Sequence, residues 1–263
     1  MNIDKLGKDL DLVREKSPLV HNITNLVVMN NTANALLSIG ASPVMAHALE
    51  EVEDMVSIAS ALVINMGTLS EKWVEAMLVA GFAAKKLNIP VVFDPVGVGA
   101  TPYRNKTAEH IIDQCKPTII RGNASEIMAL ANEKVSTKGV DSTAESNAAL
   151  EAARRLATQT GSVVVISGVE DYITDGQTVN TIKNGSLLMP KVTGMGCTAS
   201  AMVGAFAGIN PDAIEAATHA MAVMGITGEL AAAKSEGPGS MQMNFLDQLY
   251  KLTPEILAQN ITL

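Results

Sequence analysis

The sequence predicts an α/β protein in which a mainly parallel central sheet is flanked by helices on both faces. Short β-branched runs recur along the chain, and segments with helical spacing of apolar residues lie between them. One run, Val163–Ile166, is apolar on both faces. Alternating strands and helices need parallel crossovers, and a strand without polar side chains belongs in a sheet that is covered on both sides.

The first elements follow from these patterns in chain order. We expect strands where β-branched runs end at turn signals: Leu62–Asn65, Val91–Asp94, Thr118–Ile120 and Val163–Ser167. Between them, Ser70–Leu87 is expected to be a helix with one apolar face made of Trp73, Val74, Met77, Leu78 and Phe82. A second helix is expected at Thr143–Gln159, where the repeating residues are Ala149, Ala152, Ala153 and Leu156.

The last third of the chain changes character. The segment Asp171–Asn184 carries Asp175-Gly176 between two β-prone stretches, which predicts a hairpin at the edge of the sheet. Helices are then expected at Cys197–Gly208, Pro211–Leu230 and Ser240–Tyr250. Without a Pro/Ser-rich linker or an internal repeat, residues 1–263 are predicted to form a single domain.

Composition excludes several classes of protein. With 48% hydrophobic and 17% charged residues in 263, the chain is too apolar to be disordered. Its 19 basic and 27 acidic residues give a net charge of −8, so no nucleic acid partner is expected. No secretory signal and no membrane-spanning run is visible, which predicts a cytoplasmic protein without a membrane role. Cys115 and Cys197 show no spacing typical of a disulfide framework or a zinc site.

Polar, glycine-rich segments follow the four predicted strands. These segments are Met66–Thr68, Asp94–Gly99, Arg121–Glu126 and Ser167-Gly168. In open α/β sheets the ligand crevice lies beyond the carboxyl ends of the strands. If the strands are parallel, the four segments meet on one rim of the sheet.

A late glycine-rich loop, Val192–Thr198, precedes an alanine-rich helical segment. Glycines there let backbone N–H groups converge at the positive end of a helix, which makes an anion site. A tight turn with close helix packing explains the same pattern equally well. The loop comes too late for a dinucleotide-binding fingerprint, and the chain has no Walker A motif and no Gly-x-Ser-x-Gly nucleophile elbow.

Four side chains near these loops have a chemical interpretation and a structural one. Asp94 and Glu126 suit Mg²⁺, which takes a few carboxylates plus water and phosphate oxygens, or they are a turn residue and a helix cap. Arg121 suits a phosphate, or it forms an ion pair at the surface. Cys197 at a helix N-terminus is expected to have a lowered thiol pKa, or it is a small buried hydrophobe.

Taken together, six segments in order along most of the chain resemble the hydroxyethylthiazole kinase family of the ribokinase-like superfamily. They are His21–Asn25, Ser42–Met45, Asn65–Thr68, Asp94–Ala100, Arg121–Glu126 and Val192–Cys197. The resemblance implies a ribokinase-like layered fold. It also implies transfer of the γ-phosphate of ATP to the hydroxyl of 4-methyl-5-(2-hydroxyethyl)thiazole, with Mg²⁺ as cofactor, in salvage of the thiazole half of thiamine.

The resemblance also implies roles for individual residues. Arg121 and Ser167 would contact ATP, Asp94 and Glu126 would arrange Mg²⁺, and Gly194, Gly196 and Cys197 would form the catalytic anion hole. Met45 and Gly194 would border the thiazole, with Asn25 and Gly67 as further neighbours. Members of the family look like homotrimers with pockets at subunit interfaces, so Met45 and Gly194 would come from different chains.

Two departures from the resemblance keep alternatives open. Met195 stands where many relatives have Thr or Ala. Cys197 stands where the superfamily usually has an Asp that acts as the catalytic base. A thiol can still orient a hydroxyl, because phosphoryl transfer depends mainly on positioning and charge neutralisation. The alternatives are another ribokinase-like activity, such as a hydroxymethylpyrimidine or pyridoxal-type kinase or an ATP-dependent dehydratase, and a nucleotide-binding sensor with a weakened base.

Overall fold

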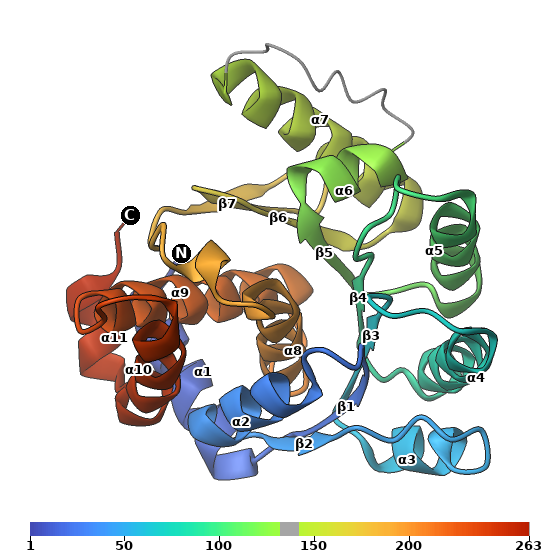
Figure 1. The fold of residues 1–263 in the computed structure, drawn as a ribbon, viewed down its shortest axis with the longest axis horizontal. Helices are drawn as coiled ribbons and strands as arrows, with labels where there is room; N and C mark the ends of the chain where they lie inside the picture. Colours follow the sequence, from blue (N-terminus) through green and yellow to red (C-terminus); the bar gives the residue numbers. More distant parts are fainter. Residues whose placement is uncertain (132–141, 263) are drawn as a thin grey trace.

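The structure is a computed structural model that describes residues 1–131 and 142–262, with the backbone alone at 142–146. An eight-stranded sheet in the order β2-β1-β3-β4-β5-β6-β7-β8 runs through its centre (Figure 1). The strands are β1 (Leu19–Ile23), β2 (Ser42–Val44), β3 (Ala61–Asn65), β4 (Val91–Asp94), β5 (Ile119–Asn123), β6 (Val163–Ser167), β7 (Asp171–Thr174) and β8 (Val179–Ile182). Strands β1 to β6 pair in parallel, and β7 and β8 pair antiparallel.

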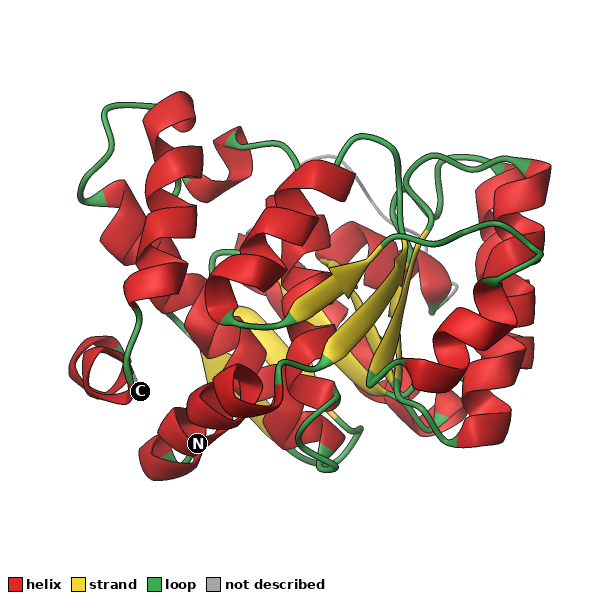
Figure 2. Ribbon diagram, turned by 90° about the horizontal axis from the view of Figure 1, so that it is seen from below, coloured by secondary structure: helices red, strands yellow, loops and turns green. Residues whose placement is uncertain are grey.

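Helices cover both faces of this sheet, as the sequence predicts (Figures 1 and 2). One layer holds α1 (Ile3–Lys16), α2 (Met29–Ile39), α8 (Met195–Ala207), α9 (Ala213–Ala232), α10 (Pro238–Lys251) and α11 (Pro254–Asn260). The other holds α3 (Val52–Ile58), α4 (Glu71–Leu87), α5 (Pro102–Cys115), α6 (Ala124–Leu130) and α7 (Ser142–Thr160). A short 3₁₀ turn, Met189–Lys191, precedes α8.

Two hydrophobic cores, one on each face of the sheet, hold the layers together. On one side Phe206 of α8 and Phe245 of α10 belong to a core that also includes Val20 of β1 and Val63 of β3. On the other side Phe93 of β4 packs against the helices that follow β3, β4 and β5. Successive side chains of a strand point to opposite faces of the sheet, and here both faces bury apolar residues, as a parallel sheet requires.

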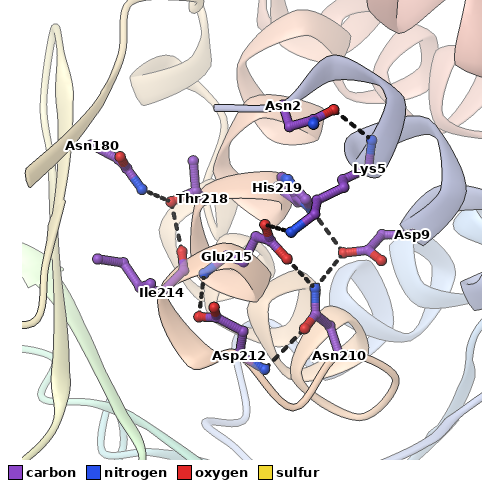
Figure 3. Close-up of polar contacts among 10 residues, drawn as sticks. All are labelled: Asn2, Lys5, Asp9, Asn180, Asn210, Asp212, Ile214, Glu215, Thr218 and His219. Carbon is purple, nitrogen blue, oxygen red and sulfur yellow. Dashed lines mark hydrogen bonds and ion pairs between the residues drawn. The ribbon is translucent and has the colours of Figure 1, made fainter. Parts of the chain in front are cut away.

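A buried polar cluster joins the first helix to α9 (Figure 3). His219 Nδ1 lies 2.7 Å from Asp9 Oδ2, and Asn210 Nδ2 donates to the same oxygen at 2.8 Å. At the rim of the cluster Lys5 pairs with Glu215 at 2.7 Å. Because a buried carboxylate needs partners, this cluster fixes where α1 can dock.

The structure confirms the hairpin at the edge and corrects two details. β7 and β8 flank Asp175-Gly176 at one end of the sheet. The strand expected at Thr118–Ile120 instead runs from Ile119 to Asn123, because Arg121, Gly122 and Asn123 continue the pairing with β6. Phe82 does not belong to the buried face of α4, since its side chain is 59% exposed. Among the described helices, none is long and apolar enough to cross a membrane.

Candidate active site

The carboxyl ends of β3, β4, β5 and β6 form one continuous rim, because these four strands are neighbours and parallel. Asn65 and Asp94 are register partners at the ends of β3 and β4, and Asn123 and Ser167 are partners at the ends of β5 and β6. The expected meeting of the four polar segments on one rim is confirmed.

Asp94 is the most deeply buried acid on this rim. One carboxylate oxygen, Oδ2, accepts hydrogen bonds from Asn65 Nδ2 at 2.9 Å and Ser200 Oγ at 2.7 Å, and it lies 3.9 Å from Arg121 Nη1. The other oxygen, Oδ1, is buried and has no hydrogen-bond partner among the described residues. Burial raises the pKa of Asp94 from 3.8 to about 6, against the opposing effect of the Arg121 charge.

Arg121 is held between the sheet and α8. Its Nη2 donates a hydrogen bond to Ser167 Oγ, so the two residues expected to contact ATP lie together. A Cβ at Gly196 would lie 2.8 Å from Arg121 Nη1. Glycine at this position therefore lets the guanidinium approach the first turn of α8, beside Asp94.

Glu126 organises the loops around the same site. Its Oε1 accepts the N–H of Gly97 at 2.9 Å, and its Oε2 accepts the N–H of Asn123 at 2.9 Å, completing a capping box at the start of α6. Glu126 therefore acts as a helix cap, as its structural interpretation predicts. Its carboxylate also connects the loop after β4 to the end of β5.

The acids on the rim fit Mg²⁺ in the way that this ion is usually held in phosphate-binding sites. No group of three or more His, Cys, Asp or Glu side chains that could hold a metal occurs in the described residues. Mg²⁺ does not need one, because it keeps several waters and takes one or two carboxylates plus phosphate oxygens. The unpartnered Oδ1 of Asp94 is an acceptor of the required kind.

Helix α8 begins at this point with free backbone donors. Its N-cap is Gly194 in the left-handed region at φ +87°, and no side chain in the described part of the chain caps the helix. The first intrahelical bond is from Thr198 N to Gly194 O, so the N–H groups of residues 195–197 have no partner within the helix. A Cβ at Gly194 would lie 2.9 Å from Val28 Cγ1, which explains glycine there. Met195 packs against the hydrophobic core and leaves these donors in place.

Cys197 lies in the first turn of α8, where Asn25 Nδ2 donates to its Sγ at 3.4 Å. The expected lowering of its pKa is wrong. Burial and the nearby Asp94 charge raise the pKa of the Cys197 thiol, and these effects exceed the opposing effects of the Asn65 and Asn25 side chains and the Arg121 charge. The group is therefore a neutral thiol at physiological pH.

Of the residues expected around the thiazole, Asn25 and Gly67 are in contact. A Cβ at Gly67 would lie 2.6 Å from Asn25 Nδ2, so only glycine leaves room for this amide. Met45 lies apart, after the edge strand β2. Its segment is held by a bond between His21 Nε2 and Ala46 O at 2.7 Å and by stacking of His47 on Trp73.

Three residues at the site have no role in the sequence-based interpretation. Asn65 and Ser200 hold Asp94, and Arg104 of α5 donates to the carbonyls of Met66, Gly67 and Val96 at 2.5, 2.8 and 2.6 Å. Asn65 does lie in a segment that carries the family resemblance, which was the available signal. Ser200 and Arg104 are ordinary residues on helices, and nothing in the sequence distinguishes them.

The mostly parallel sheet with helices on both faces is a ribokinase-like fold. A ribokinase-like superfamily protein from Enterococcus faecalis has this fold, with a TM-score of 0.68 at 12% identity, covering 97% of this chain and 96% of that one.

The profile of the hydroxyethylthiazole kinase family matches residues 10–255, and the chain belongs to this family. Hydroxyethylthiazole kinase from Leptospira biflexa is 57% identical over 254 residues, covering 97% of this chain and 95% of the relative. The solved hydroxyethylthiazole kinase of Pyrococcus horikoshii superposes with a TM-score of 0.91 at 38% identity, covering 98% of each chain.

Proposed function

We propose that this chain transfers the γ-phosphoryl group of ATP to the hydroxyl of 4-methyl-5-(2-hydroxyethyl)thiazole, salvaging the thiazole half of thiamine. Family membership over residues 10–255 supports the reaction. The observation in the structure that carries the proposal is the convergence of the free N–H groups of α8 with Arg121 and Asp94. These donors suit a phosphoryl group in transfer, whose charge is spread over its oxygens.

In this proposal Arg121 and Ser167 bind the phosphates of ATP, and the residues Gly194–Cys197 surround the group being transferred. Asp94 and Glu126 hold Mg²⁺, which neutralises phosphate charge when it is bound. Cys197 receives the substrate hydroxyl as a neutral thiol and orients it. Because the transition state is loose in most analyses, orientation of the hydroxyl matters more than its early deprotonation.

The thiazole pocket is proposed to lie between subunits of a homotrimer, with Met45 of one chain facing Gly194 and Cys197 of another. Asn25 and Gly67 would complete it. The exposed side chains next to Asn25 support a covered surface: Leu26 is 65% exposed and Val27 is 62% exposed. Adjacent apolar side chains beside a polar site are typical of an interaction surface. The cytoplasmic location remains a prediction.

An ADP-coupled assay tests the function. We expect ADP release with the thiazole alcohol and Mg²⁺, and little release with water as the only acceptor. Hydroxymethylpyrimidine and pyridoxal, assayed in parallel, test the other kinase activities of this fold. Faster turnover of either of these would overturn the thiazole assignment, and tight ATP binding with no turnover of any alcohol would favour the sensor.

A further inference from the structure

A closed ring of hydrogen bonds joins the acid and the thiol of the site. Asp94 Oδ2 accepts from Asn65 Nδ2 at 2.9 Å, and Asn65 Oδ1 accepts from Asn25 Nδ2 at 2.8 Å. Asn25 Nδ2 also donates to Cys197 Sγ at 3.4 Å. On the other side Ser200, one turn after Cys197 in α8, donates to Asp94 Oδ2 at 2.7 Å. The ring therefore begins and ends on α8.

Asn65 is the member that connects the two halves of this ring. Its side chain is 1% exposed, and both ends of its amide are engaged. Nδ2 donates to the carboxylate, while Oδ1 accepts from Asn25 and from the Gly67 N–H at 3.0 Å. Removing an interaction partner from buried polar groups leaves them unsatisfied, so the ring resists rearrangement.

The orientation of each amide is fixed by its partners. Turning the Asn65 amide would place its oxygen against the Asp94 carboxylate and its NH₂ against the Gly67 N–H. Asn25 is fixed in the same way, because its Oδ1 accepts the Val27 N–H at 3.1 Å. Only one arrangement satisfies every donor, and it leaves Asp94 Oδ1 without a partner among the described residues.

We propose that Asn65 is a positioning residue for phosphoryl transfer, holding the Asp94 carboxylate at one end of its amide and, through Asn25, the Cys197 thiol at the other. This inference rests on the proposed function. Asn65 then keeps a fixed distance between the Asp94 carboxylate, beside the phosphates, and the Cys197 thiol, beside the acceptor hydroxyl. Misplacement of reacting groups by about 1 Å costs on the order of 100-fold in rate.

Asn65→Leu tests the inference, because leucine has a similar size and no hydrogen-bonding group. We expect kcat with the thiazole alcohol to fall on the order of 100-fold while the KM for ATP changes less than about threefold, since Arg121 and Ser167 are untouched. Alkylation of Cys197 by iodoacetamide without substrates, followed by peptide mass, should slow by about threefold or more, because the thiolate loses its fixed donor. Cys115 is buried and serves as the internal reference.

Asn184→Ala is the matched control. Asn184 is also buried, and it bridges Glu229 and Asn260 far along the chain from this ring. It should lower the Tm as Asn65→Leu does and leave kcat and Cys197 alkylation unchanged. If Asn65→Leu does not fold, Asn65→Asp is the second variant. It keeps the shape of the side chain and the oxygen that accepts from Asn25, and it puts an oxygen in place of the NH₂ that donates to Asp94. Its kcat should fall at least about 30-fold.

A kcat within about threefold of wild type in either folded Asn65 variant overturns the proposal. So does an equal loss of kcat in Asn184→Ala, which would mark the effect as general destabilisation. If the wild-type chain does not phosphorylate the thiazole alcohol at all, the proposed function fails. The alkylation rates then still decide whether Asn65 positions Cys197.

Discussion

Among single residues, Asp94 sets the expected response of the activity to pH. Its pKa is raised to about 6 by burial, and the ionised form is the one that can hold Mg²⁺. We expect kcat/KM to fall about tenfold per pH unit below pH 6, because kcat/KM reports the ionisations of the free enzyme. Initial rates from pH 5 to 9 at saturating Mg²⁺ measure this limb.

The same pKa shift affects stability with the opposite sign from that of an ordinary salt-bridged acid. Between pH 3.8 and about 6 the folded chain keeps a proton on Asp94 that the unfolded chain has lost. The contribution of Asp94 to the free energy of unfolding therefore decreases as pH rises through this window. Asp94→Asn should abolish this contribution, and a decrease in the free energy of unfolding that persists across this pH window in the variant would assign it to another group.

Gly196 illustrates a residue that stability alone does not explain. Alanine is favoured over glycine within a helix by about 1 kcal/mol, but its Cβ would lie 2.8 Å from Arg121 Nη1. We expect Gly196→Ala to raise the KM for ATP about tenfold without lowering the Tm. Steady-state kinetics and thermal unfolding measure the two effects.

Gly239→Ala is the control for this variant. Gly239 occupies the same position in α10 that Gly196 occupies in α8, and a Cβ there would meet no atom within 4 Å. Its kinetics should be those of the wild type. An unchanged KM for ATP in Gly196→Ala would show that Arg121 does not depend on this close approach.

For single residues, the sequence indicates which side chains lie at the site better than it indicates which hydrogen bonds orient them. Asp94, Arg121 and Ser167 follow apolar strands, so their place on the rim is predictable, and the structure brings them together. Asn65 and Ser200 act by orienting Asp94 from another strand and from a helix more than 100 residues later. Hydrogen bonds across such distances depend on the assembled fold and leave no local pattern.

Among the elements, α5 has a role beyond covering the sheet. Arg104 in its first turn donates to the carbonyls that follow β3 and β4, at Met66, Gly67 and Val96. Carbonyl oxygens accept two hydrogen bonds, and a guanidinium presents five donors in a fixed fork. This one side chain therefore fixes two of the rim loops relative to each other.

We expect Arg104→Lys to loosen these loops, because an ammonium group cannot reproduce the fork. Turnover should fall about tenfold or more, and exchange of amide hydrogens in residues 66–68 and 96–99 should become faster. Lys106, exposed two residues later in α5, provides the control as Lys106→Arg. Unchanged exchange in Arg104→Lys would show that the loops hold themselves in place.

Helices and strands could be predicted where their buried residues are large and apolar. The sequence does not predict β1, because His21 and Asn22 interrupt its apolar run. Both side chains are nevertheless buried. On α4 only Phe82 was wrongly assigned to the buried face, because small residues form much of the buried stripe. A Cβ at Gly81 would lie 2.2 Å from Cys115 Sγ, so α4 and α5 pack too closely for Phe82 to lie between them.

For the whole molecule, the order of the strands is what assembles the site. Four consecutive parallel strands place their polar ends side by side, and the long return through the β7–β8 hairpin brings α8 back over β3 and β4. The alternation of strands and helices predicted the parallel sheet and its two layers. It could not predict that α8 lies over this rim, because that depends on packing between segments far apart in the chain.

The proposed trimer makes a prediction about activity shared between subunits. If Met45 and Cys197 of one pocket belong to different chains, a chain with Met45→Glu and a chain with Cys197→Ala are each inactive alone. In a ring of three that contains both kinds of chain, one of the three interfaces pairs an intact Met45 with an intact Cys197. Co-expressed chains with two different tags, purified through both, should therefore recover about a third of wild-type kcat per trimer.

Two tagged forms of Cys197→Ala, purified in the same way, control for incidental activation and should stay inactive. Native mass spectrometry of the doubly purified sample gives its composition. Mixed trimers without recovered activity would place Met45 and Cys197 of each pocket in the same chain, and the absence of any trimer would remove the shared pocket. Recovery requires contact between subunits at the rim, which the exposed Leu26 and Val27 beside Asn25 would provide.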